Sequence, residues 1–329
     1  MKNIVICSDG TGNEFGENNT NVVEAYSICK KTPSQVVFYD PGVGTGSWEY
    51  TEGQDPGEES LKSLSDQVTG NGLQNNVNDA YKFLMETYED GDRIYLFGFS
   101  RGAFTVRSLA GMLYKVGLLP AENDNLIPYA AKLYNIEGNV EIAHGFRDTF
   151  SRHCPVHFVG VWDTVASLVM NAGKRWHSHA LNPEVKFAYH ALSIDEKRKD
   201  FPPCLWLEAP NEVAPGQVIE QVWFAGVHSD VGGWYEERGL ANISLHWMLA
   251  KASSRGLKID SRQLGTRQAN PHDEMHSSFK GIWRIRGRHV RKIPAGSRVH
   301  ASVFERKRRR SNNYKPKNLL TRSHYEIVE

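Results

Sequence analysis

The sequence has few cysteines, and their spacing argues against most cysteine chemistry. The four are Cys7, Cys29, Cys154 and Cys204, and no two of them form a Cys-x-x-Cys pair. Zinc cages and dithiol redox centres need closely spaced cysteines, so we expect neither here. We expect reduced, mostly buried thiols and no bound cofactor.

The sequence also lacks long apolar runs and an excess of charge of one sign. The apolar run at residues 4–7 is too short for a signal-peptide core, and no stretch approaches the length of a membrane span. The formal net charge of +1 argues against a protein that binds nucleic acid or membranes over its whole surface. We expect a cytoplasmic location, and export by a machine that needs no signal peptide stays open.

The composition is that of an ordinary globular protein. Hydrophobic residues make up 40% and charged residues 23% of the 329 positions, enough for a large core without disulfides or metals. Since single domains usually stop growing at about 250–300 residues, a chain of 329 residues could make one large domain or two ordinary ones. We expect one large domain over residues 1–311. We expect insertions near 42–72 and 171–216, either of which could cover a site, and a C-terminal tail over 312–329.

Short apolar runs that end in polar or glycine-rich turns predict buried strands at residues 4–7, 36–39, 94–97, 156–162 and 222–226. Helical spacing predicts a helix over 76–88 and another after the third strand, with Gly117 as its C-terminal cap. Buried strands separated by helices predict an α/β fold, with a mostly parallel sheet and helices on both faces. Polar functional groups then gather at the carboxyl edge of the sheet.

A Gly-x-Ser-x-Gly pentapeptide at residues 98–102 follows the third predicted strand and precedes a predicted helix. A serine in such a strained turn needs small neighbours, and Gly98 and Gly102 meet that need. The turn also points the backbone N–H of Arg101 toward an oxyanion. In this context Ser100 is predicted to be a hydrolase nucleophile rather than a structural serine in a tight turn.

Two later strands end in residues that can complete a catalytic triad. Asp163 follows the fourth predicted strand, and His228 follows the fifth in a glycine-rich loop. The chain order Ser, then Asp, then His is that of α/β-hydrolases. We expect His228 to take the proton of Ser100 while Asp163 orients the imidazole. Asp230 stays a competing acid, and His300 a competing base.

The first predicted strand ends in the motif Asp-Gly-Thr at residues 9–11. The backbone N–H groups of Gly10 and Thr11 are candidates for the second oxyanion donor, and Asp9 is a further candidate site residue. The motif also resembles the start of haloacid dehalogenase phosphatases. Cys7 stands where their nucleophilic aspartate belongs, so we disfavour phosphotransfer.

Thirteen histidines raise the question of a metal site. His177 with His179, and His272 with His276, are spaced suggestively. A proline and weak apolar periodicity in residues 268–278 predict a solvated loop there instead of a helix with two ligands on one face. We expect no bound metal.

Several sequence blocks together resemble one known family. The blocks are residues 9–13, 98–103, 160–165 and 224–233, with 299–303 as a further familial element. They resemble α/β-hydrolases of uncharacterised function, a group that also supplies the catalytic domain of type VI secretion phospholipase effectors. The resemblance implies a Ser/Asp/His ester hydrolase with Ser100 as nucleophile, acting on lipid or phospholipid acyl esters.

A basic stretch at residues 280–310 holds twelve Lys or Arg residues against one acid, Glu305, with Trp283 and Phe304 interleaved. It could attract an anionic membrane surface, or it is a solvated basic face. Nucleic-acid binding is not expected, because no aromatic platform or groove-fitting helix is recognisable. A non-catalytic module that binds anionic lipid or a protein partner is the alternative function, and nothing in the sequence indicates the oligomeric state.

Overall fold

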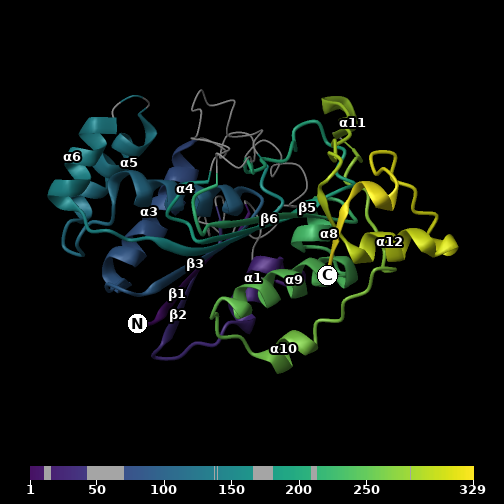
Figure 1. Ribbon diagram of the computed structural model, residues 1–329, viewed down its shortest axis with the longest axis horizontal. Helices are drawn as coiled ribbons and strands as arrows, with labels where there is room; N and C mark the ends of the chain where they lie inside the picture. Colours follow the sequence, from purple (N-terminus) through teal and green to yellow (C-terminus); the bar gives the residue numbers. More distant parts are fainter. Residues whose placement is uncertain are drawn as a thin grey trace, which may run out of the picture.

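The computed structural model of the chain describes residues 1–10, 16–42, 70–136, 138, 140–165, 181–208, 213–281 and 283–329. In this part of the chain eight strands form one sheet, in the order β2-β1-β3-β4-β5-β6-β7-β8 (Figure 1). All neighbouring strands in it are parallel. The strands are β1 (Asn3–Ser8), β2 (Gln35–Asp40), β3 (Arg93–Phe99), β4 (Val156–Trp162), β5 (Phe187–Ser193), β6 (Val218–Phe224), β7 (Arg298–His300) and β8 (Glu326–Val328).

Helices connect the strands and cover both faces of the sheet. They are α1 (Asn21–Ile28), α3 (Gly70–Thr87), α4 (Arg101–Val116), α5 (Ile127–Asn135), α6 (Val140–Phe150), α8 (His228–Gly232), α9 (Gly239–Ser254), α10 (Ser261–Gly265), α11 (Trp283–Arg286) and α12 (Ala301–Arg308), with short 3-10 turns η1 (Asp124–Leu126), η2 (Arg310–Asn312) and η3 (Arg322–His324).

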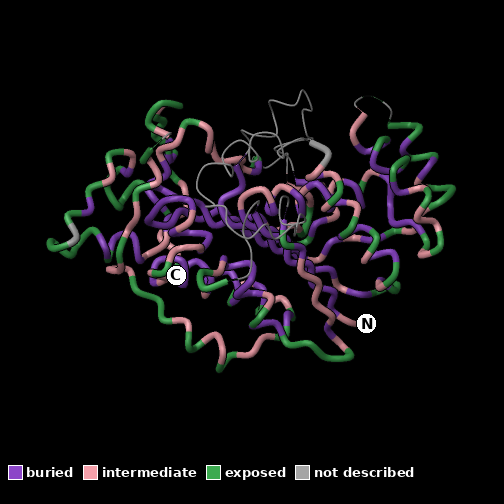
Figure 2. The backbone as a smooth tube through the Cα atoms, turned by 180° about the vertical axis from the view of Figure 1, so that it is seen from behind, coloured by how far each residue is buried: buried purple, intermediate pink, exposed green. Residues whose placement is uncertain are grey.

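Successive side chains of β1 point to opposite faces and meet different helices. Ile4 and Ile6 pack in one cluster with α3, α4, α5 and α6, whereas Val5 and Cys7 pack in another with α1 and α9. Figure 2 shows buried residues gathered at the centre of the molecule, and β1, β3, β4 and β5 are almost entirely buried. This burial on both faces explains why the strands are continuous apolar runs instead of alternating ones.

The path of the chain across the sheet reverses between β1 and β3. The chain leaves β1 for the edge strand β2 and returns to the other side of β1 as β3. The helix that follows β1, α1, and the helix that follows β3, α4, lie on opposite faces. In doubly wound sheets the loops diverge at such a reversal, and ligands bind there at the carboxyl edge.

The structure confirms the predicted fold class, an α/β-hydrolase-like and mostly parallel sheet with helices on both faces. The first four predicted strands lie within β1 to β4, and the fifth overlaps β6. Gly117 caps α4 with φ at 71°. No helix in the described residues is long and apolar enough to cross a membrane.

The expected insertion at 171–216 includes a strand of the central sheet. It contains β5, which lies between β4 and β6 and has all seven residues buried. His190 and Ser193 interrupt its apolar run, but both are hydrogen-bonded within the core. Residues 166–180, and residues 43–69 of the other expected insertion, lie outside the described residues.

The expected tail at 312–329 is wrong, because this segment completes the sheet. β8 pairs in parallel with β7 from Arg298 to His300. Tyr314, Leu319 and Tyr325 are buried in a cluster with residues of β5, β6 and α12. A segment with mixed polar composition thus joins the domain through a few large apolar side chains.

Candidate active site

Ser100 occupies a strained turn between β3 and α4. Its φ of 56° and ψ of −117° are unfavourable for a residue with a side chain. Its backbone N–H donates to the carbonyl of Trp162 at 3.1 Å, which ties the turn to the end of β4. Strain of this kind at a strand-to-helix turn is typical of nucleophile elbows.

Gly98 and Gly102 are required by close packing around this turn. A Cβ on Gly98 would lie 2.5 Å from the carbonyl oxygen of Gly102. A Cβ on Gly102 would lie 2.0 Å from the carbonyl oxygen of Ser8, at the end of β1. Both glycines therefore let α4 start directly against the two central strands.

Asp163 and His228 are brought together at the carboxyl edge although 65 positions separate them. Asp163 follows β4 with φ at 42°, and His228 opens α8 just after β6. His228 Nδ1 lies 2.6 Å from Asp163 Oδ2, and the two side chains are 6% and 0% exposed. The backbone N–H of Ser193, at the end of β5, donates to Asp163 Oδ1 at 3.0 Å.

The carboxylate of Asp163 has a further partner, Arg291, which the sequence analysis missed. Arg291 Nη1 donates to Oδ1 at 2.6 Å, and Nη2 donates to Oδ2 at 3.0 Å. The same nitrogens donate to the carbonyls of Ser193 and Phe201. Arg291 lies inside the basic stretch, but its side chain is 1% exposed and belongs to the site.

Burial and charge act in opposite directions on the Asp163–His228 pair. Burial raises the pKa of Asp163, but the charge of Arg291 and the hydrogen bond from His228 outweigh it and hold the pKa well below its usual range. Burial lowers the pKa of His228, and Asp163 offsets this only in part. A neutral imidazole with its proton on Nδ1 follows, so Nε2 carries a lone pair. That nitrogen is buried and has no hydrogen-bond partner among the described residues.

Aromatic rings and a second carboxylate surround the imidazole of His228. The rings of Phe99 and Phe201 lie 4.6 and 5.2 Å from it, centroid to centroid. Glu196 accepts the backbone N–H of His228 at 3.3 Å and is itself paired with Arg198 at 2.9 Å. Burial would raise the pKa of Glu196, but Arg198 lowers it to about 2. The sequence held no signal for this pair, because both lie in a short charged run after β5.

Asp230, the competing acid, has other partners. Its carboxylate accepts the backbone N–H of Val227 at 2.9 Å and contacts Nδ1 of His276 at 2.8 Å. Burial raises the pKa of Asp230. In the described part of the chain Asp230 makes no side-chain hydrogen bond to His228, whose Nδ1 contacts Asp163 instead.

His300, the competing base, lies at the start of α12. Its Nδ1 lies 2.8 Å from Ser302 Oγ and accepts the Ser302 backbone N–H at 3.3 Å. Burial lowers the pKa of His300 to about 4. Of the histidines weighed as metal ligands, His177 and His179 lie outside the described residues, and Nε2 of His272 lies 3.5 Å from Glu305 Oε1. No group of three or more His, Cys, Asp or Glu side chains in the described segments is arranged to hold a metal.

The candidate oxyanion donors differ in their positions. Arg101 opens α4 directly after the elbow serine. The N–H of Gly10 already donates to Asp9 Oδ1 at 2.7 Å, and Thr11 lies outside the described residues. Asp9 is buried, and its Oδ2 accepts the hydroxyl of Thr20 at 2.6 Å. Asp9 therefore braces the loop after β1.

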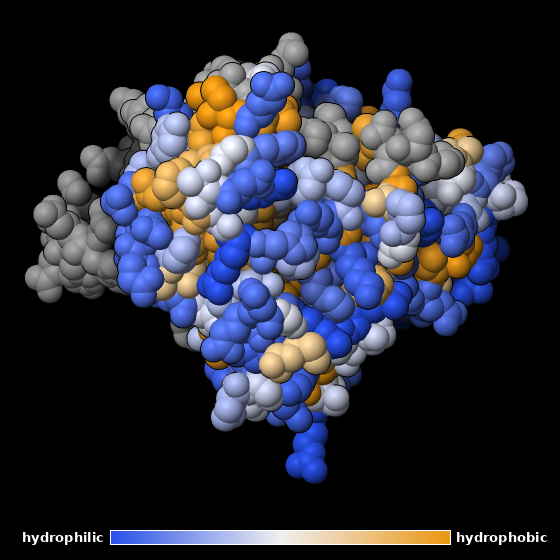
Figure 3. Space-filling model, turned by 60° about the vertical axis from the view of Figure 1, so that its left-hand side comes forward, coloured by the Kyte–Doolittle hydropathy of each residue, from blue (hydrophilic) through white to orange (hydrophobic). Residues whose placement is uncertain are grey.

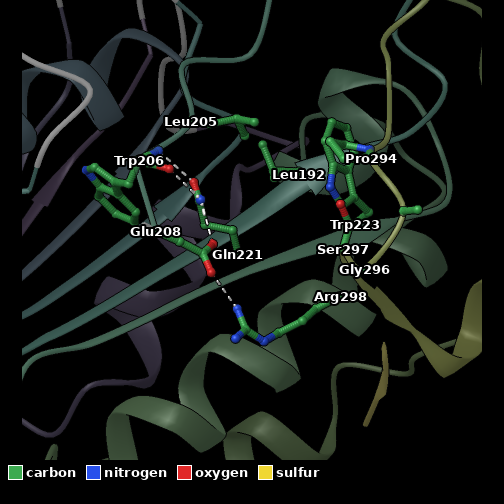
Figure 4. Close-up of a pocket in the computed structure, with 11 residues that line it drawn as sticks. Leu192, Leu205, Trp206, Glu208, Gln221, Trp223, Pro294, Gly296, Ser297 and Arg298 are labelled. Carbon is green, nitrogen blue, oxygen red and sulfur yellow. Dashed lines mark hydrogen bonds and ion pairs between the residues drawn. The ribbon is translucent and has the colours of Figure 1, made fainter. Parts of the chain in front are cut away.

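A cavity of about 310 Å³ lies beside β5 and β6, and neither Asp163 nor His228 lines it (Figure 4). Its charged and polar groups satisfy one another: Arg298 pairs with Glu208 at 2.9 Å, and Gln221 hydrogen-bonds the backbone of Trp206. The lining residues are Leu192, Leu205, Trp206, Glu208, Gln221, Trp223, Pro294, Ala295, Gly296, Ser297 and Arg298.

The chain is similar to proteins of bacteria and yeast. Over 217 residues it is 33% identical to the uncharacterized protein YEL023C of Saccharomyces cerevisiae. The aligned region covers 61% of this chain and 32% of the yeast protein. The chain thus spans about a third of the length of this relative. The structure also resembles the crystal structure of an uncharacterized protein from Pseudomonas aeruginosa, with a TM-score of 0.49 and 18% sequence identity. The superposed region covers 82% of this chain and 49% of the Pseudomonas chain.

A second solved structure is that of the Tle1 effector bound to the VgrG spike from the type 6 secretion system. It is 18% identical, covers 71% of this chain and 51% of that chain, and has a TM-score of 0.41. The family described as "T6SS, Phospholipase effector Tle1-like, catalytic domain" matches residues 2–251. Because this match takes in most of the 329 residues, the chain belongs to the family of T6SS Tle1-like phospholipase effector catalytic domains.

Proposed function

We propose that this chain is a serine hydrolase that cleaves acyl esters of lipids, with phospholipids as its substrate class. Membership in a family of phospholipase effector catalytic domains supports the substrate class. The observation that carries the chemistry is the 2.6 Å contact between His228 and Asp163. A strained Ser100 follows β3, which pairs with β4, the strand that Asp163 follows.

In the first half-reaction the hydroxyl oxygen of Ser100 attacks the ester carbonyl carbon, and Nε2 of His228 takes the hydroxyl proton. Asp163 keeps the imidazole oriented and stabilises the imidazolium. The imidazolium gives the proton to the leaving alkoxide as the C–O bond breaks, and the acyl group stays on Ser100. Water then attacks the acyl carbon and gives a proton to Nε2 of His228. His228 passes that proton to the Ser100 oxygen as the bond between this oxygen and the acyl carbon breaks, and the fatty acid leaves.

The oxyanion of each tetrahedral intermediate is stabilised by the start of α4. The backbone N–H of Arg101 is the first donor, and this helix of 16 residues directs the positive end of its dipole toward the elbow. A second donor from Gly10 or Thr11 stays a prediction. Gly10 would have to exchange its present acceptor, Asp9, for the oxyanion.

Two costly features favour catalysis over a non-catalytic lipid-binding or partner-binding module. The backbone strain at Ser100 costs about 1–3 kcal/mol and persists only when the surroundings enforce it. Nε2 of His228 is a buried nitrogen without a partner in the described residues, whereas most buried polar atoms are hydrogen-bonded. A binding module has no use for either feature.

A fluorophosphonate, which phosphonylates activated serines, tests the assignment. We expect the natural chain to be labelled and Ser100→Ala to remain unlabelled. His228→Ala should label at least about 1,000 times more slowly, because the serine loses its base.

Ser108→Ala is the matched control, since Ser108 is a buried serine of the same helix, α4. It should label like the natural chain. Absence of labelling in the folded natural chain would reject the proposal and favour the non-catalytic module.

A further inference from the structure

The short helix α11 holds an apolar side chain out into solvent. Ile285 is 87% exposed, and Arg284, Arg286 and Arg288 next to it are exposed as well. Val290 adds a second exposed apolar side chain. The face shown in Figure 3 is mainly hydrophilic, with several hydrophobic patches.

Two successive edge-to-face aromatic contacts connect α11 to the candidate active site. The ring of Trp283 lies 5.4 Å from that of Phe201 at an interplanar angle of 88°, and Phe201 in turn packs on His228 at 5.2 Å. The guanidinium of Arg198 lies 3.4 Å from the Phe201 centroid and 5.1 Å from that of Trp283. One aromatic ring therefore separates α11 from the imidazole, and in Figure 1 α11 lies above α8.

The structure divides the basic stretch at 280–310 into inward and outward cations. Arg291 and Arg306 are buried, and Arg298 is paired with Glu208 and Glu326. Arg284 and Arg288 form no ion pair with a described residue. Uncompensated positive charge and an exposed isoleucine therefore coincide at α11.

We propose that residues 284–290, the α11 surface, dock onto an anionic phospholipid membrane; the inference rests on the proposed lipid hydrolase function. Exposed arginines pair with lipid phosphates, and an apolar side chain between them enters the boundary between headgroups and acyl chains. The contacts from Trp283 through Phe201 to His228 fix the position of the candidate active site relative to the docked α11 surface. The docked enzyme thus has His228 close to the bilayer surface.

Sedimentation with phosphatidylglycerol vesicles and with phosphatidylcholine vesicles tests the surface. The natural chain should bind the anionic vesicles more tightly. Arg284→Gln with Arg288→Gln should weaken this binding about 30-fold, at about fivefold per arginine. Ile285→Ser should weaken it about tenfold.

The matched control is Lys307→Gln with Arg309→Gln, which removes the same charge from the exposed end of α12 and the residue after it. This variant should bind like the natural chain. Equal binding to both vesicle types, or loss of binding in the α12 variant instead of the α11 variant, would overturn the proposal.

Hydrolysis of a soluble short-chain ester distinguishes a failure of membrane docking through α11 from a failure of the proposed hydrolase function. The α11 variants leave Ser100, Asp163 and His228 intact, so they should hydrolyse the soluble ester normally and lose activity only on vesicles. A chain that binds anionic vesicles through α11 but hydrolyses no ester would reject the function and keep the surface. Normal hydrolysis with no vesicle binding would reject the surface alone.

Discussion

Asp163 shares one carboxylate between two cationic groups of different kinds. Arg291 is permanently charged and fully desolvated, whereas His228 becomes charged only during the proposed reaction. The arginine keeps the carboxylate ionised in spite of its burial. Burial lowers the pKa of His228, and the charge of Arg198 lowers it further. The proposed base therefore stays neutral, and ready to accept a proton, below its ordinary pKa of about 6.5.

Arg291→Gln should move the acidic limb of the kcat/KM profile to higher pH. Under the proposed mechanism, activity requires neutral His228 and should be lost as the pH falls through the pKa of His228, which is lowered in the natural chain. Without the guanidinium the full charge of Asp163 acts on His228 and raises this pKa. Breaking the buried pair should also lower the free energy of unfolding by about 3–5 kcal/mol. Rates measured from pH 4 to 9, at a temperature where both proteins are folded, check the shift.

Arg306→Gln serves as the control for Arg291→Gln. Arg306 is buried too, but it donates to the carbonyls of Pro271 and Asp273. Its replacement should lower stability without moving the acidic limb. An unmoved limb in folded Arg291→Gln would contradict the role given to Arg291.

At the scale of residues, the sequence predicted those site members that directly follow an apolar run. Asp163 and His228 were expected to meet, and the structure brings them together. Their catalytic roles and that of Ser100 stay predictions. Arg291 could not be found, because it lies 128 positions from Asp163 in a run of cations that is typical of a solvated surface.

At the scale of elements, the crossing of α4 over the end of β1 positions the elbow. The crossing is so close that a methyl group at Gly102 meets the backbone of Ser8 and Asp9. Backbone cannot give way as a flexible side chain can. The separation between helix and strand is therefore set by this one glycine.

Gly102→Ala should displace α4 from β1 and abolish hydrolysis and fluorophosphonate labelling. We expect a loss of about 3 kcal/mol or more in the free energy of unfolding, because the new Cβ would lie 2.0 Å from the Ser8 carbonyl oxygen. Urea unfolding and ester hydrolysis measure both effects.

The control for this variant is Gly145→Ala on α6. Nothing lies within 4 Å of a Cβ at this position. The change should be neutral or stabilise the chain by about 0.5–1 kcal/mol, because alanine favours a helix interior. A Gly102→Ala protein as stable and active as Gly145→Ala would show that α4 can shift without consequence.

Strands with polar residues were the elements that the sequence did not reveal. In β5, Nε2 of His190 accepts the N–H of Thr164 at 3.1 Å, while Nδ1 lies 3.3 Å from the side-chain oxygen of Gln221. These partners come from β6 and from the loop after β4, so the buried position of His190 depends on tertiary contacts. β7 and β8 have three residues each, too few for a periodic pattern.

At the scale of the whole molecule, the domain continues beyond the part that matches the family. The match ends at residue 251, whereas Arg291, β7 and β8 all follow it. The final segment also braces the site from outside. Tyr314 donates its hydroxyl to Asp195, and the side-chain amide of Asn318 donates to the carbonyls of Ile194 and Arg291.

A chain ending at residue 311 should be much less stable than the full chain. It loses β8 and the buried side chains of Tyr314, Leu319 and Tyr325, each worth about 2–5 kcal/mol in a core. That sum is comparable to the whole stability of an ordinary domain. Circular dichroism during heating measures the loss.

Lys315→Gln with Lys317→Gln is the control, because it changes two exposed positions of the same segment. Its stability should stay within about 0.5 kcal/mol of the natural value. A shortened chain with an unchanged melting temperature would show that residues 312–329 are a tail after all.

Because Arg291 follows Asp163 by 128 positions, the ribosome synthesises the arginine well after the aspartate. Ribosomes add about 5–20 residues per second, so the 128 positions between the two residues correspond to about 6–26 s of translation. During that interval the nascent chain already holds the elbow serine and the acid, but not the cation that keeps the acid charged in its buried setting. Under the proposed mechanism, the nascent chain is therefore inactive toward the membranes of the cell that makes it until Arg291 has been synthesised and has joined the folded domain.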